Sequence, residues 1–177
     1  IALSGGIDGT VGHYLANDNH KKATEIAGQF SEIFGPERFY LEIQDRGGDM
    51  ELNRKIVDLS KELSLPIVAT NDVYYLERGD ARAREALIAI NDGRSVPAAG
   101  QTEANSYKYL RSAEEMWEIF GGELPESLNN TLKITDMCNL VIPMGDDVRQ
   151  LPNFPIPDEF ASKSSDEYFE HVLREGF

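Results

Sequence analysis

Oxygen-bearing side chains fall at the ends of apolar stretches that have the pattern of buried strands. Ser4 ends the first stretch, Glu42 lies in "RFYLEIQ" and Asp72 follows "PIVAT". Side chains alternate along a strand, so Tyr40, Glu42 and Gln44 share one face, as do Thr70, Asp72 and Tyr74. Carboxylate and hydroxyl oxygens are ligands for hard cations. The pattern therefore predicts a candidate cation site built from Ser4, Glu42 and Asp72, although Asp72 could also be a turn carboxylate bonded to backbone N–H groups.

Such a site is incomplete for phosphoester hydrolysis. Two-metal centres use several histidines or further carboxylates. None of the chain's three histidines falls at a strand end, and we expect all three to lie at the surface: His13, His20 and His171.

The turn "LSGGIDG" offers a second kind of chemistry, because N–H groups at a strand-to-helix turn can hold phosphate. It resembles the Ser-Gly-Gly-x-Asp-Ser loop of the N-type ATP pyrophosphatases. Gly9 stands where that motif has its last serine, and the first basic side chain is Lys21. We favour a tight turn between a strand and its helix, and keep the pyrophosphatase as a remote alternative.

Two further candidates are more simply structural. Cys138 continues a helical stripe and is expected to be a core residue rather than a nucleophile. Trp117 and Phe120, three residues apart, are likewise expected in the core.

Composition limits the function classes. The chain has 177 residues, 41% of them hydrophobic and 27% charged, which is typical of a soluble globular protein. Its apolar runs are far shorter than the roughly 20 residues that span a bilayer, so we expect no membrane partner and a cytoplasmic location. A net charge of −14 repels phosphate backbones, so DNA would have to be bound by other domains. The chain begins inside a strand without a methionine, which we interpret as a fragment.

Periodicity predicts the elements that position these residues. Strands are expected at 1–4, 38–44 and 66–70. Helical stripes from Ala23 to Phe34 and from Leu52 to Leu63 lie between them. This alternation is typical of a parallel α/β sheet, whose functional groups collect at the carboxyl ends of its strands. Those ends are Gly5-Gly6, Gln44-Asp45 and Asn71-Asp72.

Beyond residue 75 the pattern becomes helical. A stripe of Ala83, Ala86, Leu87 and Ile90 is followed by an irregular stretch at 94–105. Ser112 and Glu115 form a capping box, and Pro125 begins a further helix. Residues 143–157 carry four prolines and read as an extended linker before a last amphipathic segment around Tyr168 to Leu173.

The ordered set of motifs resembles a known family along nearly the whole chain. "LSGG", "IFGPERFYLEIQ", "LPIVATNDVYYL", "AREALIAINDGRSV" and "SYKYLRSAEEMWEIF" are similar, in order and spacing, to the α subunit of bacterial DNA polymerase III, the replicative polymerase of family C. The similarity implies that residues 1–142 are the C-terminal half of a PHP (polymerase and histidinol phosphatase) domain. Residues 143–177 would be the linker and start of the polymerase module. The similarity also implies that the PHP domain folds as a distorted seven-stranded β/α barrel.

The same resemblance implies a damaged metal site. Family members with an intact site bind a metal cluster and can show 3′–5′ exonuclease activity. Their "LSGC" cysteine falls on Gly6, and in "ATND-x-H" the aspartate falls on Asp72 and the histidine on Tyr74. Gly6 has no side chain to coordinate, and a phenol with a pKa of about 10 is a poor ligand. Asp72 alone would be a vestigial ligand. Zn or Mn is expected in the PHP site only if that site is active. Mg is expected in the polymerase module of the full-length protein.

A PHP domain without metal serves, in this family, as a scaffold and as a docking surface for the proofreading exonuclease subunit. We expect that role and further replicase subunits as partners. The alternatives are an active metal-dependent PHP phosphoesterase or 3′–5′ exonuclease and, remotely, the ATP pyrophosphatase.

Overall fold

The computed structural model describes residues 1–47, 49–95, 106–142, 144 and 155–176. It divides into two compact units, Ile1–Cys138 and Asn139–Phe177. Much of the sequence predicted to be an irregular loop (94–105) and of the predicted linker (143–157) lies outside the described residues.

The first unit contains a parallel sheet with the strand order β1-β2-β3. The strands are β1 (Ala2–Leu3), β2 (Phe39–Gln44) and β3 (Ile67–Thr70). Ala2 pairs with Phe39, and Leu41 to Gln44 pair with Ile67 to Thr70. The predicted parallel α/β arrangement is thus confirmed among the described residues, whereas closure into a seven-stranded barrel stays a prediction.

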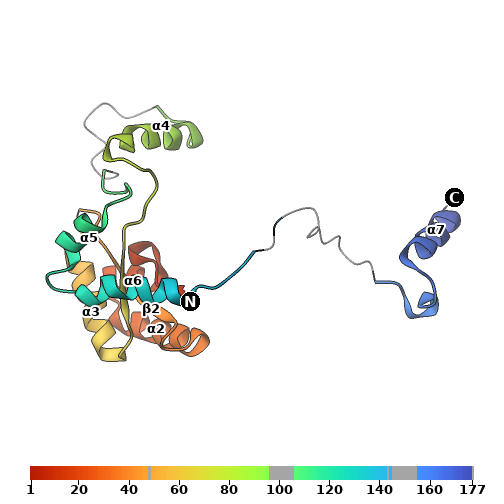
Figure 1. Cartoon of the computed structure of the whole chain (residues 1–177), viewed down its shortest axis with the longest axis horizontal. Coiled ribbons are helices and arrows are strands. Elements are labelled where there is room, and N and C mark those ends of the chain that lie inside the picture. Colours follow the sequence, from red (N-terminus) through yellow and green to blue (C-terminus); the bar gives the residue numbers. More distant parts are fainter. Residues whose placement is uncertain (48, 96–105, 143, 145–154, 177) are drawn as a thin grey trace. The chain divides into compact units, whose positions relative to one another are not determined.

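Helices connect the strands and cover them (Figure 1). After β1, a 3₁₀ turn η1 (Gly6–Asp8) leads into α1 (Thr10–Ala16) and α2 (His20–Phe34), and α3 (Met50–Leu63) links β2 to β3. Gly35, with φ 89°, ends α2 as the sequence predicted. The break between α1 and α2 at Asn17 to Asn19 was not predicted.

The core forms where these helices meet the sheet. Phe39, Leu41 and Ile43 of β2 are almost fully buried, because β2 is the central strand of the described sheet. They belong to one apolar cluster with residues of α1, α2 and α3, and with β3, Phe120 and Leu128.

The helices after β3 are η2 (Arg78–Asp80), α4 (Ala81–Asn91), α5 (Ala113–Phe120) and α6 (Pro125–Met137). The predicted capping box of Ser112 and Glu115 is present, and α6 starts at Pro125. α6 packs on β3, where the Asn130 amide donates to the Ile67 carbonyl at 2.7 Å. α4 extends away from the sheet (Figure 1).

Several residues expected in the core are at the surface instead. Cys138 follows the last turn of α6 and is exposed, and Trp117 is 46% exposed while Phe120 is buried. Along α4, Leu87 and Ile90 are exposed because Ala81, Glu85 and Ala89 form its buried side. A helical stripe identifies an apolar face but not whether a neighbour covers it.

The second unit contains η5 (Asp158–Phe160) and α7 (Ser165–Gly176). Phe160, Tyr168 and His171 form a small aromatic cluster. The helix predicted around Tyr168 to Leu173 is present as α7, and none of its described residues is buried.

Candidate polar centre at the carboxyl ends of the strands

Glu42 lies at the middle of a polar group that joins all three described strands. Its carboxylate accepts hydrogen bonds from the Gly5 backbone N–H (2.9 Å) and the Gln44 side-chain amide (2.9 Å), and also from the Thr70 hydroxyl. The Glu42 backbone N–H donates to the Ser4 hydroxyl oxygen at 2.8 Å. The structure therefore brings Ser4 and Glu42 together, as predicted, but protein donors already surround the carboxylate.

Gly6 faces the side chain of Gln44. A Cβ at position 6 would lie 2.7 Å from Gln44 Cδ and closer still to its amide oxygen. The backbone at Gly6 has φ 55°, the left-handed region that favours glycine. Gln44 thus fills the space in which a side chain at position 6 would begin. The cysteine of the "LSGC" motif would require the Gln44 side chain to move and would hold a strained backbone conformation.

Asp72 carries a cationic partner from a distant part of the chain. Lys108 Nζ donates to Asp72 Oδ2 at 2.7 Å, and the two side chains are only 15% and 20% exposed. Arg46 Nη1 lies 4.0 Å from the same oxygen, and pairs more closely with Asp8 at 3.0 Å and Asp49 at 3.1 Å. Burial opposes the charge of Arg46, but the hydrogen bond and charge of Asp49, with Asp8 and Asp72, raise its pKa above the usual value.

Tyr74 also faces cations. The guanidinium of Arg84 lies 3.5 Å from the centre of its ring, and the Lys108 ammonium lies 4.7 Å from it. Aromatic faces attract such cations through the ring quadrupole. Tyr74 and Asp72 therefore both bind Lys108, and their surroundings are those of a basic side chain rather than of a bound metal.

Lys108 belongs to residues 106–112, which we call the strap. Tyr74 N donates to Lys108 O at 2.8 Å and Leu110 N to Tyr75 O at 2.9 Å. Arg111 Nη2 pairs with Asp45 at 3.1 Å, and its side chain is 4% exposed. The strap thereby joins the ends of β2 and β3, and it supplies the cations that sequence reasoning missed.

The strap ends in the capping box of α5. The Tyr109 hydroxyl donates to Glu115 Oε1 at 2.6 Å. This bond and the Ser112 backbone N–H lower the pKa of Glu115, and the same bond raises the pKa of Tyr109.

The glycine turn does not have the geometry of a phosphate loop. The Gly5 N–H is occupied by Glu42. A Cβ at Gly9 would lie 2.8 Å from the Ser4 carbonyl carbon and nearer still to its oxygen. The pyrophosphatase serine therefore does not fit at position 9 on this backbone, because a backbone carbonyl cannot move aside as a side chain can.

The remaining candidates lie away from this centre. His20 is exposed and lies 3.2 Å from Glu62, and His13 is exposed with its ring against Tyr14. His171 belongs to the second unit. Within the part of the chain that the structure describes, no group of three or more His, Cys, Asp or Glu side chains could hold a metal ion. Gly6, Asp72 and Tyr74 thus do not form a ligand set that fits the metal cluster implied by the resemblance.

Residues 1–46 match the family model of the PHP domain. The match covers β1, β2 and the helices between them, which contribute Glu42, Gln44 and the Gly6 turn.

Along nearly its full length the chain is similar to α subunits of DNA polymerase III. It is 37% identical over 179 residues to that subunit of Pseudomonas fluorescens, 35% over 179 residues to that of Escherichia coli K12 and 33% over 180 residues to that of Treponema pallidum. Each alignment covers 99% of this chain but 15% of the relative. The resemblance expected from the sequence is confirmed, and the chain corresponds to a small part of these subunits. Among the helices described, none is long and apolar enough to cross a bilayer.

Proposed function

We propose that this chain is part of the α subunit of a bacterial replicative DNA polymerase, a template-directed enzyme that uses Mg in its polymerase module. Similarity over 99% of the chain to subunits with that name supports the proposal. Replication takes place in the bacterial cytoplasm, so that is the location we propose, with other replicase subunits as partners and DNA bound through other domains.

Within that subunit, we propose that the chain is a scaffold whose metal site is degenerate. One observation carries this: the two carboxylates at the strand ends are held by protein groups. Glu42 accepts from Gly5, Gln44 and Thr70, and Asp72 pairs with Lys108. A metal would have to displace a mostly shielded ammonium from Asp72 and three hydrogen-bond donors from Glu42, which is unfavourable.

A direct test measures metal content and nuclease activity of the full-length protein. We expect less than stoichiometric zinc and manganese, and 3′-labelled primers that persist with or without either ion. Asp72→Ala should change neither result. Stoichiometric metal together with 3′ cleavage, both abolished by Asp72→Ala, would instead establish the active PHP phosphoesterase or exonuclease.

The scaffold would also dock the proofreading exonuclease subunit. The net charge of −14 supports a protein partner over bare DNA, since an acidic surface repels phosphates. Co-elution of the full-length protein with the exonuclease subunit encoded by the same genome is the test. Two separate elution peaks at micromolar concentrations would rule out this role.

A further inference from the structure

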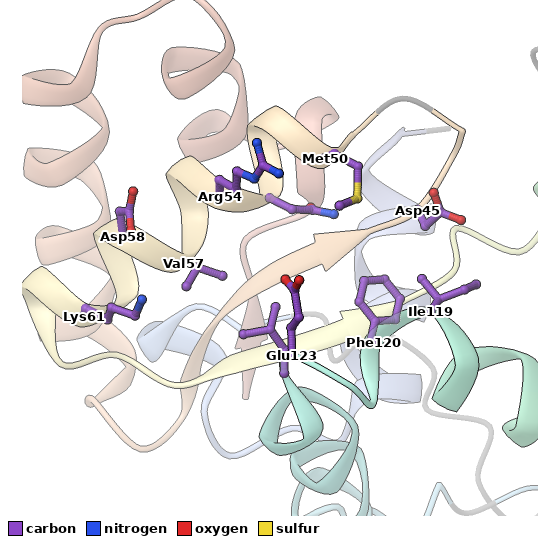
Figure 2. A pocket seen from close by; sticks show the side chains of 11 residues that line it. Asp45, Met50, Arg54, Val57, Asp58, Lys61, Ile119, Phe120 and Glu123 are labelled. Atoms are coloured by element: carbon purple, nitrogen blue, oxygen red, sulfur yellow. The ribbon is translucent and has the colours of Figure 1, made fainter.

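A groove runs between α3 and the α5–α6 junction in the first unit (Figure 2). Its volume is about 410 Å³. One wall comes from α3 and the other from the end of α5 and the start of α6, with Asp45 near one end. We call this the α3–α5 groove, and it borders the polar centre described above at Asp45, which pairs with Arg111.

The groove combines apolar side chains with polar and charged ones, and some of the apolar groups are exposed. Its apolar side chains are Met50, Val57, Ile119, Phe120 and Leu124. Phe120 is buried and forms part of the core, whereas Met50 is 59% and Ile119 39% exposed. Side chains of both walls project toward the space between them (Figure 2). Large apolar groups at the rim of a concave surface mark sites of interaction more often than isolated exposed residues do.

The charges on α3 indicate what kind of partner fits. Arg54 and Lys61 line the groove, and neither has an ion pair with any residue that the structure describes. Their neighbour Lys55, outside the groove, pairs with Glu51 at 3.2 Å and Asp18 at 2.6 Å. At the polar centre, Arg46, Lys108 and Arg111 are paired as well. Unpaired cations that flank exposed apolar side chains favour carboxylates from a partner.

The spacing of these charges suggests a helix. Arg54 and Lys61 are seven residues apart on α3, which is about two turns or 10 Å. Asp58 lies between them on the same wall and Glu123 lies on the other. A helix laid along the groove would match this pattern with carboxylates two turns apart and a basic residue between them. Large apolar side chains on its inner face would fill the groove.

We propose that the α3–α5 groove binds an amphipathic helix of a partner protein, with acidic, basic and acidic residues along one flank and a large apolar anchor. The inference rests on the proposed docking role and takes the helix to belong to the exonuclease subunit. It adds a location and a recognition chemistry that the docking role does not specify.

The test reverses the two cations in the full-length protein. Arg54→Glu with Lys61→Glu should weaken the affinity for the exonuclease subunit about tenfold or more, since each substitution replaces attraction with repulsion. Lys21→Glu, on α2 and without an ion pair among the described residues, is the matched control and should stay within about twofold. All three positions are exposed, so thermal melting should show that the variants fold.

The outcomes distinguish the docking role from the assignment of the α3–α5 groove as its site. Equal binding by the wild type, the double variant and the control would overturn the groove as the site and leave the docking role intact. Absence of wild-type binding would overturn the docking role and this inference with it. A photo-cross-linking residue at Ile119 should capture a partner peptide with the acidic–basic–acidic order. A cross-link to another part of the same chain would contradict the proposal.

Discussion

The carboxylate of Asp72 lies 2.7 Å from the ammonium of Lys108, although the two residues are 36 positions apart in the chain. The pair is mostly shielded from water, since the two side chains are 15% and 20% exposed. A covalently tethered cation thus satisfies the carboxylate, and the end of β3 is joined to the strap.

Removing this cation should destabilise the protein. We expect Lys108→Met to lower the free energy of unfolding by about 1–3 kcal/mol, because Asp72 would keep its charge without its closest partner. Asp72→Asn with Lys108→Met should cost less than the sum of the single changes by about 1 kcal/mol. Urea unfolding of the four proteins measures this coupling, and additive effects would show that the pair contributes nothing specific.

Restoring the cysteine of the "LSGC" motif should not restore a metal site. Gly6→Cys would push a Cβ into Gln44 and would hold a non-glycine residue at φ 55°. We expect a loss of about 2–3 kcal/mol. The same change in a Gln44→Ala protein, compared with Gln44→Ala alone, should cost only the backbone part of about 1 kcal/mol. Thermal melting measures the stability. Stoichiometric zinc in Gly6→Cys alone would contradict the account of Gln44.

Position 9 should not tolerate the pyrophosphatase serine. Gly9→Ser brings a Cβ against the backbone of Ser4, so we expect a loss of more than about 3 kcal/mol or failure to fold. Gly28→Ser is the matched control, because no atom lies within 4 Å of a Cβ built there. Circular dichroism melts of both variants decide the matter, and a well-folded Gly9→Ser protein would reopen the ATP interpretation.

The capping box of α5 should make stability depend on pH in the acid range. The folded pKa of Glu115 is lowered by the Tyr109 hydroxyl and the Ser112 N–H, so the native state favours the charged carboxylate. This contribution is fully present above the unfolded pKa of about 4.3 and is lost as the pH falls through the folded value. Glu115→Gln should therefore be less stable than the wild type at neutral pH and approach it under acid conditions. A stability difference that does not change with pH would contradict this linkage.

Local sequence patterns predicted the parts of the fold that depend on neighbouring residues. Alternation and β-branching located β2 and β3, Gly35 marked the end of α2, and Ser112 with Glu115 marked the start of α5. The parallel order followed, because helices between strands require crossover connections. The carboxyl ends of the strands were therefore correctly expected to bring Ser4 and Glu42 together.

The partners of the site could not be predicted in this way. Lys108 reaches Asp72 only because residues 106–112 pass along the ends of the strands, and no local signal sets that path. Cys138 and Trp117 were wrongly expected in the core for a related reason, since periodicity does not show which faces have neighbours. The alternation in Tyr107, Lys108 and Tyr109, which resembles an extended segment, was the one available hint.

The late position of the strap has a consequence for how the molecule assembles during synthesis. β1, β2 and β3 are complete once Thr70 has emerged from the ribosome, but the ammonium for Asp72 follows 36 residues later. At about 5–20 residues per second, the carboxylate of Asp72 lacks its closest cationic partner for seconds while the chain grows. The strap would then bind the ends of β2 and β3 only after the three strands have paired.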